Sequence, residues 1–447
     1  MAGRWSLALI GLLAAACAGT APSTSVPPSA GPSASASPAS LDVGDGRRDD
    51  LEQLVERLEA LHPNPFLDEG KAAFRARVDA VAARAGERSD AGFLVDVMGL
   101  MGHRDRDGHS GAWAMAQQGD RVHVLPVWLR DFPDGLRVVA ARSPLADIVG
   151  GIVTAVGGTP VEEARELVTP LVPADNDSNR RANLPMYLLV KEVVDELGIQ
   201  QAGATPLSLR FDDGTTRDVE VETVPIGAFR DWLFSVYPRY PTGLPPDDEG
   251  TRDRQRRDEA FWTETLPDGT LYIAYHEVRS RSGGTLTIGR LANEVAAAKG
   301  SVVVDLRSNP GGDNTTYQVF LRAVREQALA GPGRVALLTG RDTFSAAGNF
   351  VTELKVGDGG DDILLVGEPP GGGLDIYGDV ATVTLKHSGI VVLISRRYHE
   401  KAPGDDRLQI EPDVSAEATW ADALAGRDTV LEAALDSMTA LREGAAP

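Results

Sequence analysis

The pattern of apolar and polar positions changes abruptly near the start of the chain. Residues 18–46 are mainly Ala, Ser, Pro, Thr and Gly, which predicts a disordered linker that cannot bury a core. From residue 49 onward, leucines recur at helical spacing between Leu51 and Leu61, and His62-Pro63 ends the pattern. Two further helical patterns surround Phe74 and Phe93. We therefore predict a helical N-terminal subdomain over residues 47–115.

The next region alternates apolar and polar residues in short runs separated by Pro and Gly, which is typical of strands. Leu207, Leu209 and Phe211 alternate into Asp-Asp-Gly, a hairpin signal. The segment 150–160 is an apolar strand, a Gly-Gly turn and then Pro, and it resembles the corresponding part of a PDZ domain. We predict a β-rich PDZ-like module over residues 120–225, with added helices near 170–200.

Residues 226–268 read as an irregular connector. Its charged run at 247–259 is predicted to be a solvated face. The last block, residues 269–441, alternates strand and helix patterns and predicts an α/β unit with a mostly parallel sheet.

Two strand–turn–helix units lie at the centre of that α/β unit. The apolar runs Val302–Val304 and 335–338 are each followed by a turn and then by a helical pattern, at 317–330 and 346–355. In consecutive units of a parallel sheet, both turns lie at the carboxyl edge of the strands. The two turns should therefore lie close together.

Composition adds a prediction about location. Arg4 precedes an apolar run that ends at the only cysteine, Cys17, and this run is too short to span a bilayer. The small residues before Cys17 resemble a bacterial lipoprotein cleavage box, although Ala14 stands where leucine is usual. We predict a lipoprotein signal peptide at 1–17, with Cys17 lipidated and the mature chain anchored on the extracytoplasmic side of the cell membrane. The alternative is an ordinary secretory signal and a secreted protein.

Charge and residue types exclude several classes of function. The formal net charge of −21 argues against nucleic acids and anionic membrane surfaces as partners, so the membrane is reached only through the lipid anchor. One cysteine per chain excludes a disulfide framework and a cysteine metal site. No His-Glu-x-x-His motif is present, and we predict no metal and no cofactor.

The two central turns carry residues suited to acyl transfer. One turn offers the bare backbone amides of Gly311 and Gly312, and the other offers Ser345 at the start of a helix. A hydroxyl nucleophile beside free N–H groups can attack a carbonyl and hold the resulting oxyanion. The amide of Ala346 would add to this oxyanion hole. The alternative for Ser345 is a helix cap, which is a common role for serine.

One histidine lies on a turn rather than in a regular element. His109 lies in the glycine-flanked turn Asp107-Gly-His-Ser110, where a packed helix is excluded and the ring is either exposed or in a cleft. A lone histidine of this kind is more often a surface residue, and His103 is a nearby competitor.

These motifs resemble a known family. The segment Asp305-Leu-Arg-Ser-Asn-Pro-Gly-Gly312 is similar to the signature of the C-terminal-processing (tail-specific) and tricorn-type serine peptidases, and the segment Thr343–Ala347 is similar to their nucleophile segment. The turn at 107–110 resembles the histidine turn of the tricorn-like branch. The resemblance covers roughly residues 49–441 and implies a ClpP/crotonase-like α/β core.

The resemblance also implies roles for single residues. Ser345 would be the nucleophile and His109 the base, since the Gly-Lys-Gly lysine of the other branch is missing from the loop 369–373. For the acid we choose Glu400 on spacing, with Asp405 or assistance by Ser110 as alternatives. Many relatives carry an acidic residue where this chain has Gly348, a departure that favours altered specificity or an inactive relative.

The sequence therefore predicts an extracytoplasmic, lipid-anchored serine endopeptidase that acts through an acyl-enzyme. Its partner would be an extended or C-terminal peptide segment, bound by strand addition to the PDZ-like module. The alternatives are a catalytically inactive relative that binds peptides or other ligands, and a serine esterase.

Overall fold

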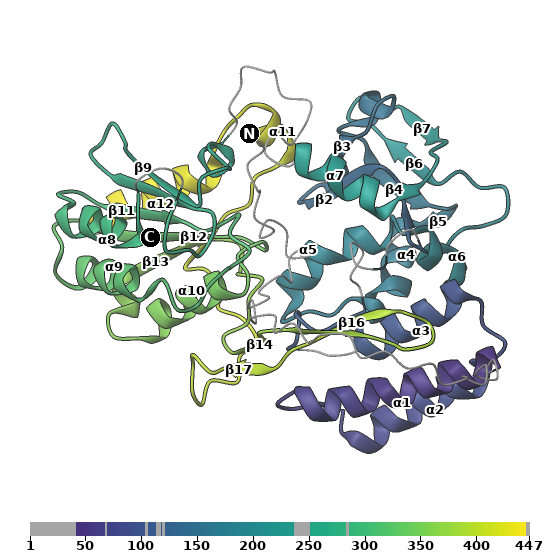
Figure 1. Ribbon diagram of the computed structural model, residues 1–447. Helices are drawn as coiled ribbons and strands as arrows, with labels where there is room; N and C mark the ends of the chain where they lie inside the picture. The colour runs from purple at the N-terminus through teal and green to yellow at the C-terminus, as the bar shows by residue number, and fades with distance from the viewer. Residues whose placement is uncertain are drawn as a thin grey trace, which may run out of the picture.

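The computed structural model describes residues 42–67, 69–102, 106–112, 118, 121–236, 251–282 and 286–443 (Figure 1). The N-terminal helices and a β-rich module form one lobe, and the larger α/β sheet with its helices forms the other. The predicted signal peptide, Cys17, most of the predicted linker and His103 lie outside the described residues. Among the described helices, none is both long enough and apolar enough to cross a bilayer.

Three helices open the first lobe: α1 (Val43–Leu61), α2 (Lys71–Arg84) and α3 (Asp90–Gly102). Helix α1 begins inside the range predicted as linker, so the folded part starts earlier than residue 47. The Asp42 side chain caps this helix by accepting from the Gly44 N–H at 3.0 Å. Gly46 is buried, and it packs so closely on the His387 side chain that a Cβ there would lie 3.1 Å from it. Tertiary contact thus extends a helix into a segment whose composition indicates a linker.

The β-rich module is an antiparallel sheet in the order β2-β3-β4-β6-β7. Its strands are β2 (Val127–Phe132), β3 (Gly135–Ala141), β4 (Ile152–Val156), β6 (Leu207–Arg210) and β7 (Thr216–Val219). The predicted hairpin is present, with Leu207 opposite Val219. Strand β5 (Thr159–Pro160) pairs with β4, and short strands β1 (His123–Val124) and β8 (Val224–Pro225) pair with each other. Helices α4 (Val161–Val168), α5 (Asp177–Tyr187) and α6 (Lys191–Glu196) complete the module.

The second lobe is built on a sheet in the order β18-β13-β12-β11-β10-β9, parallel except for β9. The central strands are fully buried, as continuous apolar runs predict. They are β10 (Leu271–Tyr275), β11 (Val302–Asp305), β12 (Val335–Thr339) and β13 (Ile363–Gly367), with β9 (Phe261–Thr265) and β18 (Val414–Ser415) at the edges.

Helices cover both faces of this sheet. Val302 and Val304 point toward one core, formed with helices α8 (Ile288–Ala297), α9 (Gln318–Ala330) and α10 (Ala346–Val356). Val303 points to the opposite face, which α12 (Thr429–Arg442) covers. The predicted mixed α/β lobe with a mostly parallel sheet is therefore present.

The predicted connector is more regular than its sequence indicates. Residues Ile226–Val236 form helix α7, and strand β9 belongs to the main sheet, so the second lobe starts before residue 269. The charged run is also not a solvated face in its described part: Asp253 and Arg257 are buried. Asp253 accepts a hydrogen bond of 2.8 Å from the Ser308 hydroxyl. Asp253 thus combines a partner far away in the sequence with the neighbouring Thr251 and Arg254.

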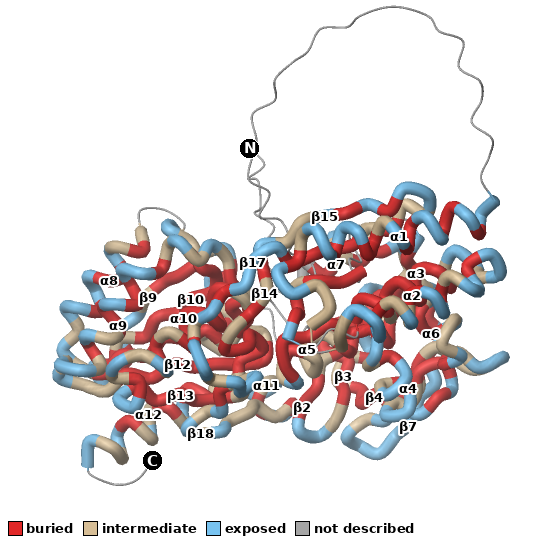
Figure 2. Tube along the Cα trace, turned by 90° about the horizontal axis from the view of Figure 1, so that it is seen from below, coloured by how far each residue is buried: buried red, intermediate tan, exposed pale blue. Residues whose placement is uncertain are grey.

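A hairpin from the C-terminal third of the chain belongs to the N-terminal lobe. Strands β15 (Ala381–Thr384) and β16 (Val391–Ile394) form an antiparallel hairpin, and their apolar side chains pack in the core of the first lobe. Leu393 and Gly111 exchange backbone hydrogen bonds of 2.9 and 3.0 Å. Figure 2 shows β15 beside α1, where the Asp50 carboxylate accepts the N–H groups of residues 387 and 388. The range 269–441 is thus not one compact unit.

Candidate active site

Ser345 lies at the turn between β12 and α10, at the carboxyl edge of the main sheet. Its backbone has φ 53° and ψ −125°, a conformation that is uncommon for a residue with a Cβ and that is found mainly at functional turns. The side chain stands at the N-cap position but forms no capping hydrogen bond, so the helix-cap alternative does not describe it. The hydroxyl points instead toward a histidine.

That histidine is His109, whose Nε2 lies 3.0 Å from the Ser345 Oγ. The two residues are 236 positions apart in the sequence and come from different lobes. The imidazole stacks on the Phe344 ring, with 4.4 Å between centroids and 20° between planes. The fold therefore brings together the serine and the histidine that the motifs single out.

The glycine turn lies directly against the serine. A Cβ on Gly311 would lie 2.7 Å from the Ser345 Cβ, and one on Gly312 would lie 2.3 Å from the Val278 carbonyl oxygen. Both glycines have positive φ, 109° and 141°, which a side chain would strain further. Only glycine fits at this approach.

The backbone amides around the hydroxyl are not equivalent. The Gly311 N–H donates to the Asn309 side-chain oxygen at 2.9 Å. For the N–H groups of Gly312 and Ala346 we find no acceptor within the described ranges. Ala346 is the first residue of α10, where the amides have no partner inside the helix. Of the three amides predicted for an oxyanion hole, two are open and one is engaged.

The histidine turn is held by a buried carboxylate. Asp107 accepts from the Ser110 N–H at 3.0 Å and from the Ser395 hydroxyl at 2.8 Å. Its other oxygen lies 3.0 Å from His62 Nε2. Because the Asn64 N–H donates to His62 Nδ1, the His62 proton is on Nε2 and is donated to Asp107.

Ser110 is bound to the crossing hairpin rather than to His109. Its hydroxyl donates to the Ser395 Oγ at 3.1 Å and accepts from the Ser395 N–H at 2.9 Å. Ser395 follows β16 directly, so the hairpin from the C-terminal third of the chain fixes the turn that carries the histidine. No sequence signal singled out Ser395.

The environment of His109 keeps its imidazole neutral. Burial lowers the pKa of His109 to about 4, against the Asp107 charge, which raises it. His399 lowers the pKa of His109 further, while the Asp379 charge raises it. The Nδ1 atom is buried and has no hydrogen-bond partner in the described part of the chain. A neutral imidazole with Nε2 at the hydroxyl can accept the serine proton.

The predicted acid does not join this pair. Glu400 is exposed, and within the described residues no hydrogen bond links it to His109. Asp405 is bound to Arg407 through bonds of 2.6 to 3.1 Å. Lys355, the only lysine near the serine in sequence, instead contacts the carbonyls of residues 360 and 363 and the Asp413 carboxylate.

The glycine loop at 369–373 packs on the nucleophile turn. The Gly372 N–H donates to the Thr343 carbonyl at 2.9 Å. A Cβ on Gly348 would lie 3.0 Å from the Gly372 Cα, tighter than ordinary contacts. An acidic side chain at position 348 would displace this loop, which gives a packing reason for the glycine.

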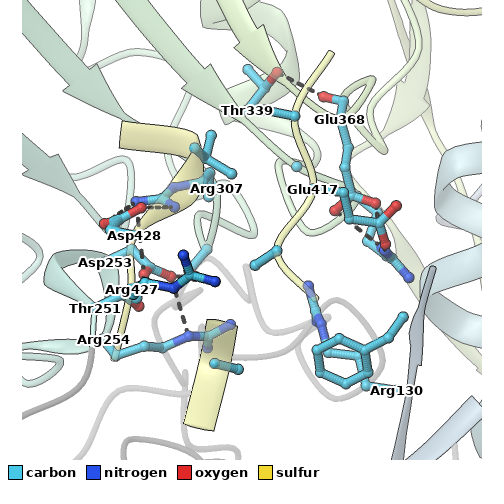
Figure 3. A pocket seen from close by; sticks show the side chains of 18 of the residues that line it. Arg130, Thr251, Asp253, Arg254, Arg307, Thr339, Glu368, Glu417, Arg427 and Asp428 are labelled. Carbon is cyan, nitrogen blue, oxygen red and sulfur yellow. Dashed lines mark hydrogen bonds and ion pairs between the residues drawn. The ribbon is translucent and has the colours of Figure 1, made fainter. Parts of the chain in front are cut away.

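A cavity of about 120 Å³ lies between the lobes and is lined by arginines and carboxylates (Figure 3). Each of the following pairs is close: Arg307 with Asp428 at 2.7 Å, and Arg130 with Asp342 at 2.7 Å. Arg341 contacts Glu368 and also donates to the Asp131 carbonyl of β2 at 3.2 Å. The Arg130–Asp342 pair and the hydrogen bond from Arg341 to Asp131 join the lobes and engage β2, an edge strand of the β-rich module. The Arg307–Asp428 and Arg341–Glu368 pairs lie within the second lobe.

Comparisons with known proteins place the fold. No protein-family profile and no curated protein matches the chain. A crystal structure of a CPAF serine-to-alanine mutant matches with a TM-score of 0.59 and 13% identity, covering 91% of this chain and 99% of that one. Mature CPAF complexed with lactacystin matches with a TM-score of 0.57 and 14% identity, covering 90% and 98%.

A weaker likeness exists to the photosystem II D1 C-terminal processing protease, with a TM-score of 0.36 and 13% identity over 86% of this chain and 98% of that one. The chain therefore has the fold of CPAF over nearly its whole described length. Within the described residues, no group of three or more His, Cys, Asp and Glu side chains is arranged to hold a metal ion.

Proposed function

We propose that the protein is a serine-type endopeptidase, with Ser345 as nucleophile and His109 as general base. The observation that carries the proposal is the 3.0 Å approach of His109 Nε2 to the hydroxyl of a serine in a strained turn. CPAF, which has the same fold, is a serine protease. A neutral buried imidazole, open amides and a serine without a capping role are the parts that acyl transfer needs.

The reaction follows from these positions. Ser345 Oγ attacks the substrate carbonyl carbon while its proton passes to His109 Nε2. The carbonyl oxygen becomes an oxyanion that accepts from the N–H groups of Gly312 and Ala346. The imidazolium then gives its proton to the leaving amine, the C–N bond breaks, and an acyl-enzyme remains. Water, deprotonated by His109, hydrolyses the ester and restores the hydroxyl.

The roles of Gly311 and the acid differ from those predicted. Since the Gly311 N–H already donates to Asn309, this residue contributes the close approach of backbone to Ser345 rather than an amide. For the imidazolium, we infer that the supporting negative charge comes from Asp107 and Asp379, the two carboxylates that raise the pKa of His109. Glu400 has no such contact.

Substrate and location complete the proposal. The substrate would be an extended or C-terminal peptide segment, and the mature chain would be attached through Cys17 on the extracytoplasmic side of the membrane. The catalytically inactive relative stays as a second candidate, because the buried Nδ1 of His109 has no partner that would orient the ring.

The test is labelling of the full-length protein with a fluorophosphonate, followed by peptide mapping. We expect a single adduct on Ser345 and none in Ser345→Ala. Ser208→Ala, at a serine bound to Asp218 on the β-rich module, is the matched control and should label normally. A folded wild-type protein without an adduct would favour the inactive relative.

A further inference from the structure

A polar cavity of about 190 Å³ lies beside the histidine turn. Its walls include Asp175, Asp375, Tyr377, Tyr398, Asp405 and Arg407. Asp175 connects it to the site, since its Oδ1 accepts the N–H of Gly108 at 2.7 Å and His109 is the next residue. A Cβ on Gly373, in the loop that packs on the nucleophile turn, would lie 3.6 Å from the Asp175 Cβ. The cavity is therefore built on both loops that position the catalytic pair.

Asp175 is the unexplained group in this cavity. Its side chain is buried, with only 2% of the residue exposed, and its Oδ2 has no hydrogen-bond partner among the described residues. A buried carboxylate oxygen without a donor is costly, and native structures pair nearly all such atoms. Burial accordingly raises the pKa of Asp175 well above its usual value, and the Asp107 charge adds to this, while hydrogen bonds from the Gly108 and Gly373 amides oppose it. A cationic donor in the cavity would remove the deficit.

The other charged groups of the cavity already have partners. Asp375 accepts from the Ala402 N–H at 2.9 Å and from the Tyr398 hydroxyl at 3.2 Å. Asp405 and Arg407 bind each other. Arg106, which also lines the cavity, has a partner of its own. An anion would find no unengaged cation here, whereas a cation would find the free oxygen of Asp175.

We propose that this cavity is a specificity subsite that takes a lysine or arginine side chain of the substrate, with the cation paired to Asp175 Oδ2. Tyr377 and Tyr398, whose ring centroids are 4.8 Å apart, line the wall of the cavity. The net charge of −21 attracts basic peptides at long range. This inference rests on the proposed peptidase function.

The experiment uses full-length protein and pairs of internally quenched peptides that differ at one position, lysine in one and norleucine in the other. The position is scanned along several residues on each side of the scissile bond. We expect one position where lysine raises kcat/KM by roughly 30-fold, the lower end of what a buried charge pair contributes. Asp175→Asn keeps an oxygen for the Gly108 amide, and we expect it to reduce that ratio to about one.

Asp218→Asn is the matched control, because it also removes one carboxylate charge but lies on the β-rich module, where Asp218 accepts from Ser208; the lysine-to-norleucine ratio should persist. Equal loss for both peptides in Asp175→Asn would mean that Asp175 only supports the histidine turn and would overturn the subsite. A wild-type protein that is labelled on Ser345 but shows no lysine preference would overturn it too. Failure of labelling would instead reject the peptidase itself.

The affinity of Ser345→Ala for the same peptides, measured by fluorescence anisotropy, gives a readout that needs no turnover. Tighter binding of the lysine peptide supports the subsite, and loss of that difference in Ser345→Ala/Asp175→Asn supports it further. Equal affinity for both peptides contradicts it.

Discussion

The turn that carries Ser345 and the turn that carries His109 are built by different means. The serine turn is local: β12 and α10 flank it, and its geometry follows from a strained backbone and two glycines packed against it. The histidine turn has little regular structure and depends on hydrogen bonds from His62, Asp107 and Ser395. The fold of the serine turn should therefore tolerate loss of the Ser345 hydroxyl. The position of His109 should instead change when any of the distant residues that bind its turn is replaced.

The largest effect should come from Ser345→Ala. If Ser345 is the proposed nucleophile, its loss should lower kcat by about 10⁴-fold or more, as loss of the nucleophile does in characterised serine hydrolases. The melting temperature should hardly change, because the hydroxyl caps no helix. Peptide cleavage and calorimetry on the same preparation check this, and a large fall in melting temperature would show that the serine has a structural role after all.

Gly311→Ala tests the serine turn through its backbone. The new methyl group would lie 2.7 Å from the Ser345 Cβ, and φ is 109°. We expect kcat to fall by about 10²-fold, because the methyl group would displace Ser345 from its alignment with His109. Unfolding free energy should fall by about 1–3 kcal/mol from the strain. Gly289→Ala, at a helical glycine with open space around it, is the control. An unchanged kcat in Gly311→Ala would contradict the close packing of Gly311 on Ser345.

Asp107→Asn tests the histidine turn through a residue that touches neither substrate nor serine. The amide cannot accept from the Ser110 N–H, the Ser395 hydroxyl and His62 as the carboxylate does. Since this leaves buried groups partly unsatisfied, the unfolding free energy should fall by about 1–3 kcal/mol. Activity should fall by about 10²-fold as the ring loses its position and the nearby charge. Denaturant titration measures the change in unfolding free energy, and kcat measures the change in activity. Full activity in Asp107→Asn would show that this hydrogen-bond network does not position His109.

The pH dependence tests the neutral state of His109. The imidazole must be uncharged to take the serine proton, so kcat/KM should be constant near neutral pH and fall below its pKa of about 4. At pH 3 it should be about tenfold below the plateau. Because this pKa lies below the 6.5 of a histidine in the unfolded chain, protonation also favours the unfolded chain, and stability should decline as pH falls from 6.5 toward 4. An inflection near 6.5 would place the ring in contact with water.

Glu400→Gln should have the smallest effect. The side chain is exposed and is not bound to His109 in the described structure, so kcat should change by less than about threefold. Asp379→Asn should be compared with Glu400→Gln, since the Asp379 charge raises the pKa of His109 and its removal should lower that pKa. A fall in kcat by orders of magnitude in Glu400→Gln would support Glu400 as the acid, as its spacing in the sequence predicts.

The sequence predicted most of what is local. The core strands are buried on both faces and read as continuous apolar runs such as Val302–Val304, and the glycine and serine turns follow them directly. Ser345 and the two glycines could be named for this reason, whereas His109 was named from its glycine-flanked turn and the family resemblance. Helix boundaries α9 and α10 also agree closely with the apolar periodicity.

What could not be predicted depends on partners far away in the chain. Periodicity identifies β15 and β16 as a hairpin but does not say which lobe they pack on. The charges of Asp253 and Arg257 indicate a solvated surface until their buried partners are known. Ser395 and Asp175 carry no motif, and only the folded chain shows that they contact the histidine turn.

The crossing hairpin has a consequence for how the protein is made. Translation produces the histidine turn early, but its supports at Leu393 and Ser395 leave the ribosome more than 280 residues later. By then Ser345 has been synthesised as well. A nascent chain therefore holds both Ser345 and His109 before the contacts that fix the histidine turn can form, and the two side chains can reach their observed geometry only when synthesis is almost complete.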